Sequence, residues 1–238
     1  MSALEWVIVL GIVFAGACAQ GSFGFGLGVT AAPVLALIDH DFVPASLLIV
    51  AFVLTVLVVA RERAALEWRP LLWALLGRLP GSLLGTWAVV ALPQQGLIVL
   101  FSVLVLLGVG LSFAGWRIRP TSRTLVVAGA ASGFMGSITS IGGPPMAIVY
   151  QHESGDRVRA SLANFFVFGA AMSLAMLAAA GEIHADDVRR ALILLPAMLL
   201  GFVASRWAAR WLDGGDLRKW LLGFSAVTSS IVLVTALV

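Results

Sequence analysis

The sequence has little charge and almost no cysteine. Of its 238 residues 11% are charged and 61% are hydrophobic, and the mean hydropathy is +1.04. Soluble domains carry about 25% charged residues, so this composition argues strongly against a water-soluble fold. The single cysteine, Cys18, excludes an internal disulfide and a metal site built from cysteines. We expect no metal and no cofactor.

Motifs of enzymes and of ATP-driven pumps are also missing. The sequence contains no His-Glu-x-x-His, no nucleophile motif and no P-loop, so we expect a protein that is not an enzyme and does not use ATP. No acidic residue lies in the interior of an apolar segment, which argues against a proton relay made of carboxylates. The net charge of +3 comes from arginines in short loops, where they set membrane orientation rather than bind nucleic acid.

Long apolar segments fill the chain instead. Crossing a bilayer takes about 20 apolar residues, and the segments run over Leu4–Ile38, Val43–Ala60, Pro70–Leu92, Gly96–Gly115, Leu125–Gln151, Ala160–Ala180, Ala191–Ala208 and Trp220–Val238. The first segment lacks a basic start and a cleavage site, so we expect it to be retained. The pattern predicts an all-α, multi-pass integral membrane protein.

The first and fifth segments are too long for one simple crossing, and glycine-rich stretches interrupt both. The breaks lie at Gly21–Gly28 and Gly133–Pro145. Dense glycine destabilises a helix, and proline removes an amide donor. Because proline suits the first turn of a helix, we expect a short helix to begin near Pro33 and another near Pro144 and Pro145.

The two halves of the chain resemble each other. Leu79-Pro80-Gly81-Ser82-Leu83-Leu84-Gly85 aligns with Leu195-Pro196-Ala197-Met198-Leu199-Leu200-Gly201, and Ala45-Ser46-Leu47 aligns with Ala160-Ser161-Leu162. Duplicated units are common in transporters. We therefore predict two repeats of about four hydrophobic segments, residues 1–118 and 119–238, within one membrane domain.

Basic residues favour one path for the broken segments. If both segments turn back as re-entrant hairpins, the loops 61–69, 116–123, 152–159 and 206–219 share a side with 12 basic residues, against 2 on the other side. If both cross once, the division is 8 against 6. Cytoplasmic loops are enriched in Lys and Arg, so we favour hairpins, inverted halves and external termini. A single crossing of the membrane by each broken segment remains the alternative.

Irregular backbone at membrane depth survives only where protein buries it or a wet cavity adjoins it. Two breaks in matching places indicate a central site, and helix N-termini with free N–H groups favour an anion there. The candidate ligands are Gly24, Gly26, Gly28, Thr30, Pro33, Arg78, Gly136, Ser137, Thr139, Ser140, Gly142, Gly143, Pro144, Pro145 and Asn164.

Each candidate type also has a structural interpretation. The small residues can serve close helix packing. Arg78 either pairs with an anionic substrate or extends its side chain to the membrane surface. Asn164 either contacts the site or hydrogen-bonds a neighbouring helix.

The stretch Gly-Ser-Ile-Thr-Ser-Ile-Gly-Gly-Pro-Pro at residues 136–145 and the duplicated layout resemble the TauE/SafE sulfite exporter family over essentially the whole chain. The resemblance marks Gly142 to Pro145 as family-like positions. The first copy lacks a Gly-Gly pair, and its Pro33 comes later.

The resemblance implies a secondary carrier of a sulfur-containing or organic anion such as sulfite, sulfoacetate or another sulfonate. Because two broken segments mark a central site, we expect alternating access, and we expect export across a bacterial inner membrane. An anion channel with a glycine-rich filter is the alternative reading. The implied partners are a small anion and the lipid bilayer. A coupling ion, proton or sodium, and a homodimer stay open.

Overall fold

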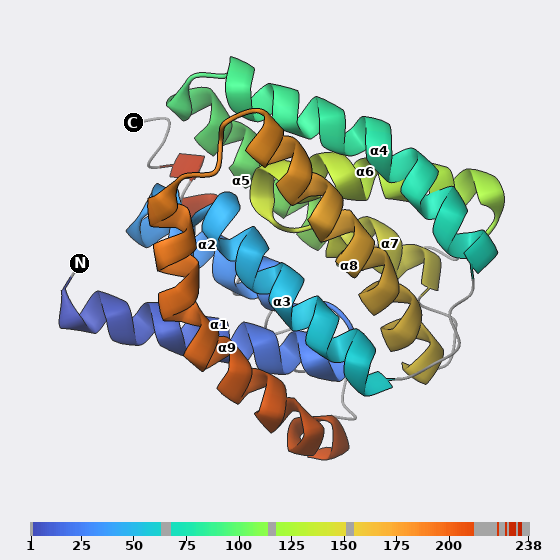
Figure 1. Ribbon diagram of the computed structural model, residues 1–238, viewed down its shortest axis with the longest axis horizontal. Helices are drawn as coiled ribbons and strands as arrows, with labels where there is room; N and C mark the ends of the chain where they lie inside the picture. Colours follow the sequence, from blue (N-terminus) through green and yellow to red (C-terminus); the bar gives the residue numbers. More distant parts are fainter. Residues whose placement is uncertain are drawn as a thin grey trace.

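The computed structural model describes residues 2–62, 68–113, 118–150 and 155–211, and beyond these only 223, 227, 229–231 and 233–234. The described part is helical. Its elements are α1 (Ala3–Phe23), α2 (Leu27–Ile38), the 3-10 turn η1 (His40–Phe42), α3 (Ala45–Glu62), α4 (Trp68–Ala91), α5 (Gln94–Phe113), α6 (Ser122–Thr139), α7 (Gly143–Tyr150), α8 (Gly155–Ala179) and α9 (Ala185–Trp211) (Figure 1).

Six stretches of this bundle are long and apolar enough to cross a membrane. They are Ala3–Phe23, His40–Arg61, Trp68–Ala91, Gln94–Leu111, Ala160–Ala179 and Ala185–Ala208. Large apolar side chains such as Trp68, Leu76 and Trp87 on α4 are exposed, as expected where lipid surrounds a helix. The prediction of an all-α, multi-pass membrane protein is confirmed. Most of the expected last segment, 220–238, lies outside the described residues.

The first long segment breaks and turns back on itself. Gly24 closes α1 with a φ of 87°, and Gly26 precedes α2 with a φ of 156°, which are conformations that favour glycine. The rings of Trp6, at the start of α1, and Phe42, just after α2, lie 6.2 Å apart. The chain therefore returns to the end where it began, and α1 and α2 form a helical hairpin.

The second long segment also turns back. Ser140 ends α6 in the left-handed conformation with a φ of 59°, and its N–H donates to the carbonyl of Gly136. Tyr150, at the end of α7, packs in one cluster with Leu125 near the start of α6 and with Ile118. Helices α6 and α7 thus form a second, shorter hairpin.

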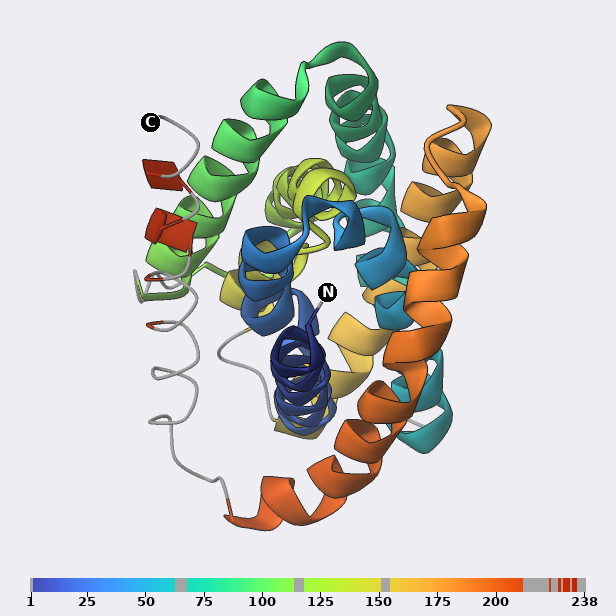
Figure 2. The same cartoon turned by 90° about the vertical axis from the view of Figure 1, so that its left-hand side faces the viewer.

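The two hairpins start from opposite ends of the bundle. Helices α3 and α9 run in the same direction, because Ser46 bonds Asp187 near their starts and Arg61 bonds Ser205 near their ends. The α1–α2 hairpin begins at the end that holds Asp41, here called the Asp41 end. The α6–α7 hairpin begins at the other, the Arg61 end. Figure 2 shows α1 and α6 nearly end-on between the flanking helices.

The hairpin paths of both broken segments are the ones that the count of basic residues favoured. Whether the halves are internal repeats, divided at residue 118, stays a prediction. Among described residues, Arg61, Arg69 and Arg123 lie at the Arg61 end, whereas Arg189 and Arg190 lie at the Asp41 end. The arrangement agrees with a cytoplasmic Arg61 end.

Both breaks are shorter than predicted, and Pro33 was placed wrongly. Helix α6 continues through Gly133 and Gly136 to Thr139, and α2 begins at Leu27. Pro33 is therefore the seventh residue of α2 and not part of its first turn. Pro144 and Pro145 do lie in the first turn of α7, as predicted.

The glycines of α6 serve the packing of this helix against α4 and do not interrupt it. A Cβ atom on Gly129 would overlap the carbonyl oxygen of Ala74, and one on Gly77 would overlap that of Val126. Helices α4 and α6 therefore pack with their backbones in contact, as small residues permit in membranes. The same contact line continues past Arg78, because a Cβ on Gly133 would lie 2.5 Å from the Arg78 carbonyl oxygen.

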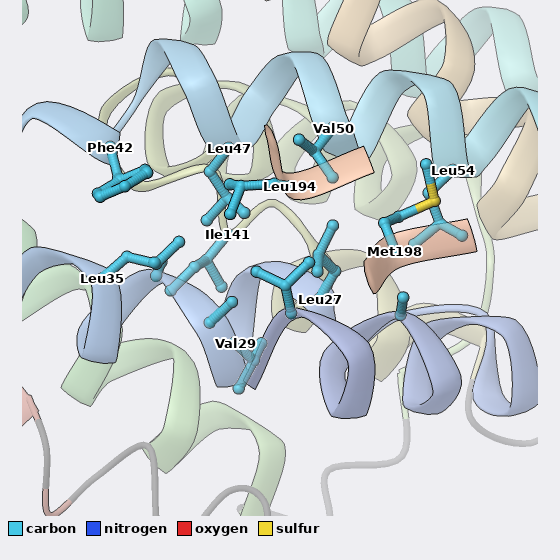
Figure 3. Close-up of a cluster of buried hydrophobic side chains, with 14 of the residues drawn as sticks. Leu27, Val29, Leu35, Phe42, Leu47, Val50, Leu54, Ile141, Leu194 and Met198 are labelled. Carbon is cyan, nitrogen blue, oxygen red and sulfur yellow. The ribbon is translucent and has the colours of Figure 1, made fainter. Parts of the chain in front are cut away.

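The main core joins α1, α2, α3 and α9, and the second break reaches into it. Figure 3 shows Ile141, from the stretch between α6 and α7, among Leu27, Leu35 and Leu47. Ile141 is 2% exposed. This contact holds the tip of the second hairpin against the first.

Candidate functional site

The tips of the two hairpins meet around a small cavity. A Cβ atom on Gly28 would overlap the carbonyl oxygen of Ser140, and one on Gly143 would lie 3.1 Å from the ring of Phe25. The cavity measures about 40 Å³ and is lined by Gln20, Phe25, Gly26, Gly28, Val29, Leu48, Ala51, Thr55, Arg78, Gly136, Ser140, Ile141, Gly142, Gly143, Phe166 and Ala170. Both breaks contribute backbone to one hollow.

Arg78 is a charged residue in the wall of the cavity. Its side chain is 2% exposed, its guanidinium carbon lies 4.8 Å from the centre of the Phe165 ring, and Nε has no hydrogen-bond partner among the described residues. Within the described ranges no carboxylate forms an ion pair with it. A buried cation without a counter-ion is costly, so a negative charge next to Arg78 would stabilise it.

Ser132 on α6 fixes the guanidinium beside the second break. Nη1 of Arg78 donates to the Ser132 hydroxyl over 3.0 Å, and that hydroxyl donates to the carbonyl oxygen of Gly142 over 2.6 Å. A Cβ on Gly136 or Gly142 would lie 3.2 or 3.3 Å from the guanidinium nitrogens, so the missing side chains let Arg78 lie flat against the backbone.

Further donors surround the cavity. Gln20 accepts the N–H of Leu27 through Oε1 over 3.1 Å, which is the one hydrogen bond of its side chain to described residues. Its amide NH2 group is therefore available as a donor. Helices α2 and α7 begin at the cavity, and helix starts carry partial positive charge. Arginine, amide and helix starts are groups of the kind that bind anions.

A second, larger hollow opens at the Asp41 end. It measures about 520 Å³ and is lined by Ala36, His40, Asp41, Val43, Pro44, Ala45, Val89, Gln94, Leu97, Ile98, Phe101, Ile138, Glu182, His184, Asp186, Asp187 and Arg190. We call it the vestibule. The hydroxyl of Ser140, which lines the cavity, donates to the carbonyl of Pro44, which lines the vestibule, over 2.9 Å.

Comparison with known proteins decides the family. The family model described as Sulfite exporter TauE/SafE matches residues 8–232 of the chain. The chain belongs to the TauE/SafE sulfite exporter family. No curated protein and no solved structure matches it. This TauE/SafE protein is thus a multi-pass membrane transporter of the sulfite-exporter type, which agrees with the resemblance noted in the sequence.

Several residues predicted for the site line the cavity of this TauE/SafE protein. They are Gly26, Gly28, Arg78, Gly136, Ser140, Gly142 and Gly143. Arg78 does not extend to the membrane surface, because its side chain is buried and bound to Ser132. That these residues bind substrate stays a prediction.

The other predicted hydroxyl and amide groups bond elsewhere. Thr30 donates to the carbonyl of Gly26 over 2.9 Å, and Ser137 donates to the hydroxyl of Ser173 on α8 over 3.0 Å. Asn164 donates to a carbonyl of its own helix, that of Ala160, over 2.8 Å. None of the three lines the cavity.

Thr139 and the remaining glycine and proline positions shape the breaks. The Thr139 hydroxyl donates to the carbonyl of Met135 over 2.7 Å and accepts the N–H of Ile141 over 3.0 Å, so it secures the end of α6. Gly24 ends α1. Pro33, Pro144 and Pro145 are buried within α2 and α7 and do not line the cavity.

Sequence reasoning missed several residues of the cavity wall, among them Gln20, Phe25, Thr55 and Phe166. Gln20 had a signal, since it is a lone amide within an apolar segment and directly precedes a break. Phe25 lies inside the first break. Thr55 and Phe166 come from α3 and α8, and only the tertiary fold brings them here. In the described ranges no group of three or more His, Cys, Asp or Glu side chains could hold a metal ion.

Proposed function

We propose that this protein is a secondary carrier that exports sulfite or a small organosulfonate across a bacterial inner membrane. The anion would bind in the central cavity, between the starts of α2 and α7. Family membership supports the substrate class. The geometry of Arg78 supports the place.

The buried guanidinium of Arg78 is the observation that carries this proposal. It is bound to the neutral Ser132, and its Nε is unpaired. An oxyanion in the cavity would supply the missing charge and accept charge-assisted hydrogen bonds from the guanidinium. Backbone approach at Gly142 and Gly143 and the amide of Gln20 would hold the remaining oxygens.

The size of the cavity favours the smallest member of the substrate class. A cavity needs roughly 10–15 Å³ of volume for each water molecule, so the central cavity of about 40 Å³ accommodates about three waters. Sulfite consists of one sulfur and three oxygens and is close to this size. A sulfonate with an organic tail needs more room than the cavity offers in this conformation.

Two separate hollows favour a carrier that works by alternating access. The cavity and the vestibule share no lining residue, and the contact of Ser140 with Pro44 lies between them. A carrier opens its site to one side at a time, and the vestibule would be the release path on the external side. The channel reading requires instead an open path past this contact.

Reconstitution into proteoliposomes tests the proposal. Purified protein should exchange labelled for unlabelled sulfite with saturation, which a channel does not do. Imposed pH or sodium gradients identify the coupling ion that we expect, and the same preparation shows whether a homodimer forms. If sulfite, sulfoacetate and simple carboxylates all exchange at the rate of empty liposomes, the proposal is wrong.

Arg78→Gln and Arg69→Gln form the matched pair. Arg69 is an exposed arginine on the same helix. Removing one partner of a buried charge pair costs about 2–5 kcal/mol, which predicts that Arg78→Gln lowers exchange at least about 30-fold. Arg69→Gln should leave it within about twofold. Equal exchange by both variants would remove Arg78 from the site.

A further inference from the structure

The turn between α1 and α2 carries one aromatic side chain, that of Phe25. Its neighbours Gly24 and Gly26 have positive φ angles of 87° and 156°. Glycine adopts such conformations readily, whereas residues with a Cβ atom rarely do. The sequence thus places a single large ring between two glycines, directly at the tip of the hairpin.

The ring of Phe25 covers the start of α7. A Cβ atom on Gly143 would lie 3.1 to 3.4 Å from three atoms of Phe25, including ring carbons. Gly143 and Phe25 both line the cavity. The ring therefore forms part of the cavity wall next to the start of α7.

Phe25 also faces away from the cavity. It packs against the main core and against the cluster around Leu71, Leu125 and Tyr150, which lies at the Arg61 end. Phe25 itself is half-buried, whereas Gly142 and Phe166 in the same cavity wall are buried. The ring thus contacts both the cavity, which it lines, and this cluster at the Arg61 end.

We propose that Phe25 is the specificity-determining residue of this transporter: its ring closes the central cavity toward the Arg61 end and sets the upper size of the anion. The inference rests on the proposed function. With the ring in place the cavity accepts a compact oxyanion beside Arg78. Without the ring, the space next to Gly143 accepts an organic group attached to the sulfonate.

Benzenesulfonate is the matching probe, because its phenyl group replaces the ring that Phe25→Ala removes. An apolar cavity left by a deleted side chain can bind an aromatic molecule of that size. The sulfonate would then lie at Arg78 and the phenyl group against Phe166. Phe14→Ala is the control, since Phe14 is on α1 and 39% exposed on the outer surface of the bundle.

The experiment compares exchange of sulfite and benzenesulfonate by wild type, Phe25→Ala, Phe25→Leu and Phe14→Ala in proteoliposomes. The benzenesulfonate-to-sulfite ratio should rise at least about tenfold in Phe25→Ala, less in Phe25→Leu, and not in Phe14→Ala. An unchanged ratio in a Phe25→Ala protein that still transports sulfite overturns the inference.

If Phe25→Ala does not transport, thermal stabilisation in detergent decides. Benzenesulfonate should raise the melting temperature of Phe25→Ala or Phe25→Leu and not that of wild type, and no stabilisation of either variant overturns the inference. Failure of the proposed function shows differently, because wild type would then neither exchange sulfite nor be stabilised by it.

Discussion

The hydroxyl of Ser140 donates a hydrogen bond to the carbonyl oxygen of Pro44 over 2.9 Å, joining the tip of the second hairpin to the junction of α2 and α3. Ser140 is also the one described residue other than glycine with a positive φ, 59°. The left-handed conformation costs a non-glycine residue about 1–2 kcal/mol. Backbone strain and an interhelical contact therefore coincide between the cavity and the vestibule.

Substitution of Ser140 should separate strain from contact. Ser140→Ala loses the hydrogen bond and keeps the strained φ, so we expect the free energy of unfolding to fall by about 1 kcal/mol. Ser140→Gly loses the same bond and gains a residue suited to this φ, so we expect little change. Denaturant unfolding in detergent micelles measures both. Equal losses would show that the φ is not strained.

Glycine contacts at the meeting point of the hairpins predict a second pair of variants. A Cβ on Gly28 would overlap the carbonyl oxygen of Ser140, whereas one on Gly11 would have no atom within 4 Å. Overpacking costs about 1–3 kcal/mol, so Gly28→Ala should lower the melting temperature and stop sulfite exchange. Gly11→Ala should raise stability by up to about 1 kcal/mol. A tolerated Gly28→Ala contradicts the close approach.

Gly169 on α8 tests whether the position of the guanidinium matters. A Cβ there would overlap Nε of Arg78, so Gly169→Ala must displace the guanidinium. We expect sulfite affinity to fall at least about tenfold, equivalent to about 1.4 kcal/mol. Gly110→Ala, where a Cβ meets nothing within 4 Å, is the control. Titration of both variants with sulfite measures their affinities. Equal affinities would show that the position of the Arg78 guanidinium does not matter for sulfite binding.

The ionic contacts of the vestibule should differ in strength. Asp41 pairs with Arg190 at 2.7 Å, but its side chain is 64% exposed. Asp187 is 11% exposed, accepts from the Ser46 hydroxyl over 3.2 Å and from the His184 N–H over 2.9 Å, and lies 3.8 Å from Arg190.

Asp41→Asn should therefore change stability by less than about 1 kcal/mol, whereas Asp187→Asn should cost about 2 kcal/mol. Added salt should reduce the first effect more than the second. Thermal unfolding at two ionic strengths checks the order, and a larger loss from Asp41→Asn than from Asp187→Asn would contradict this ranking of the two contacts.

Composition and glycine patterns predicted the fold class and the approximate place of both breaks. They failed at the limits of the breaks, because glycine has two uses that a sequence does not distinguish. Gly24 and Gly26 interrupt helices with positive φ angles, whereas Gly133 is helical and lets α6 approach the backbone of α4. Only the partner helix decides which use applies.

The same limit applies to the candidate site. Arg78 was identified because charge inside an apolar segment is costly, whatever surrounds it. Ser137 and Asn164 were also polar and central, yet they bond Ser173 and their own helix. Phe166 carried no signal at all, since an aromatic residue in a membrane helix usually meets lipid or core, and its place in the cavity wall follows from the packing of α8.

Binding of sulfite to the purified protein tests the central claim most directly, because it isolates the role of Arg78 from the transport cycle. A ligand that binds only the folded state at 100 times its dissociation constant stabilises it by about 2.7 kcal/mol. Sulfite should therefore raise the melting temperature of wild type and of Arg69→Gln, and leave that of Arg78→Gln unchanged. Equal stabilisation of Arg78→Gln and wild type would contradict the account.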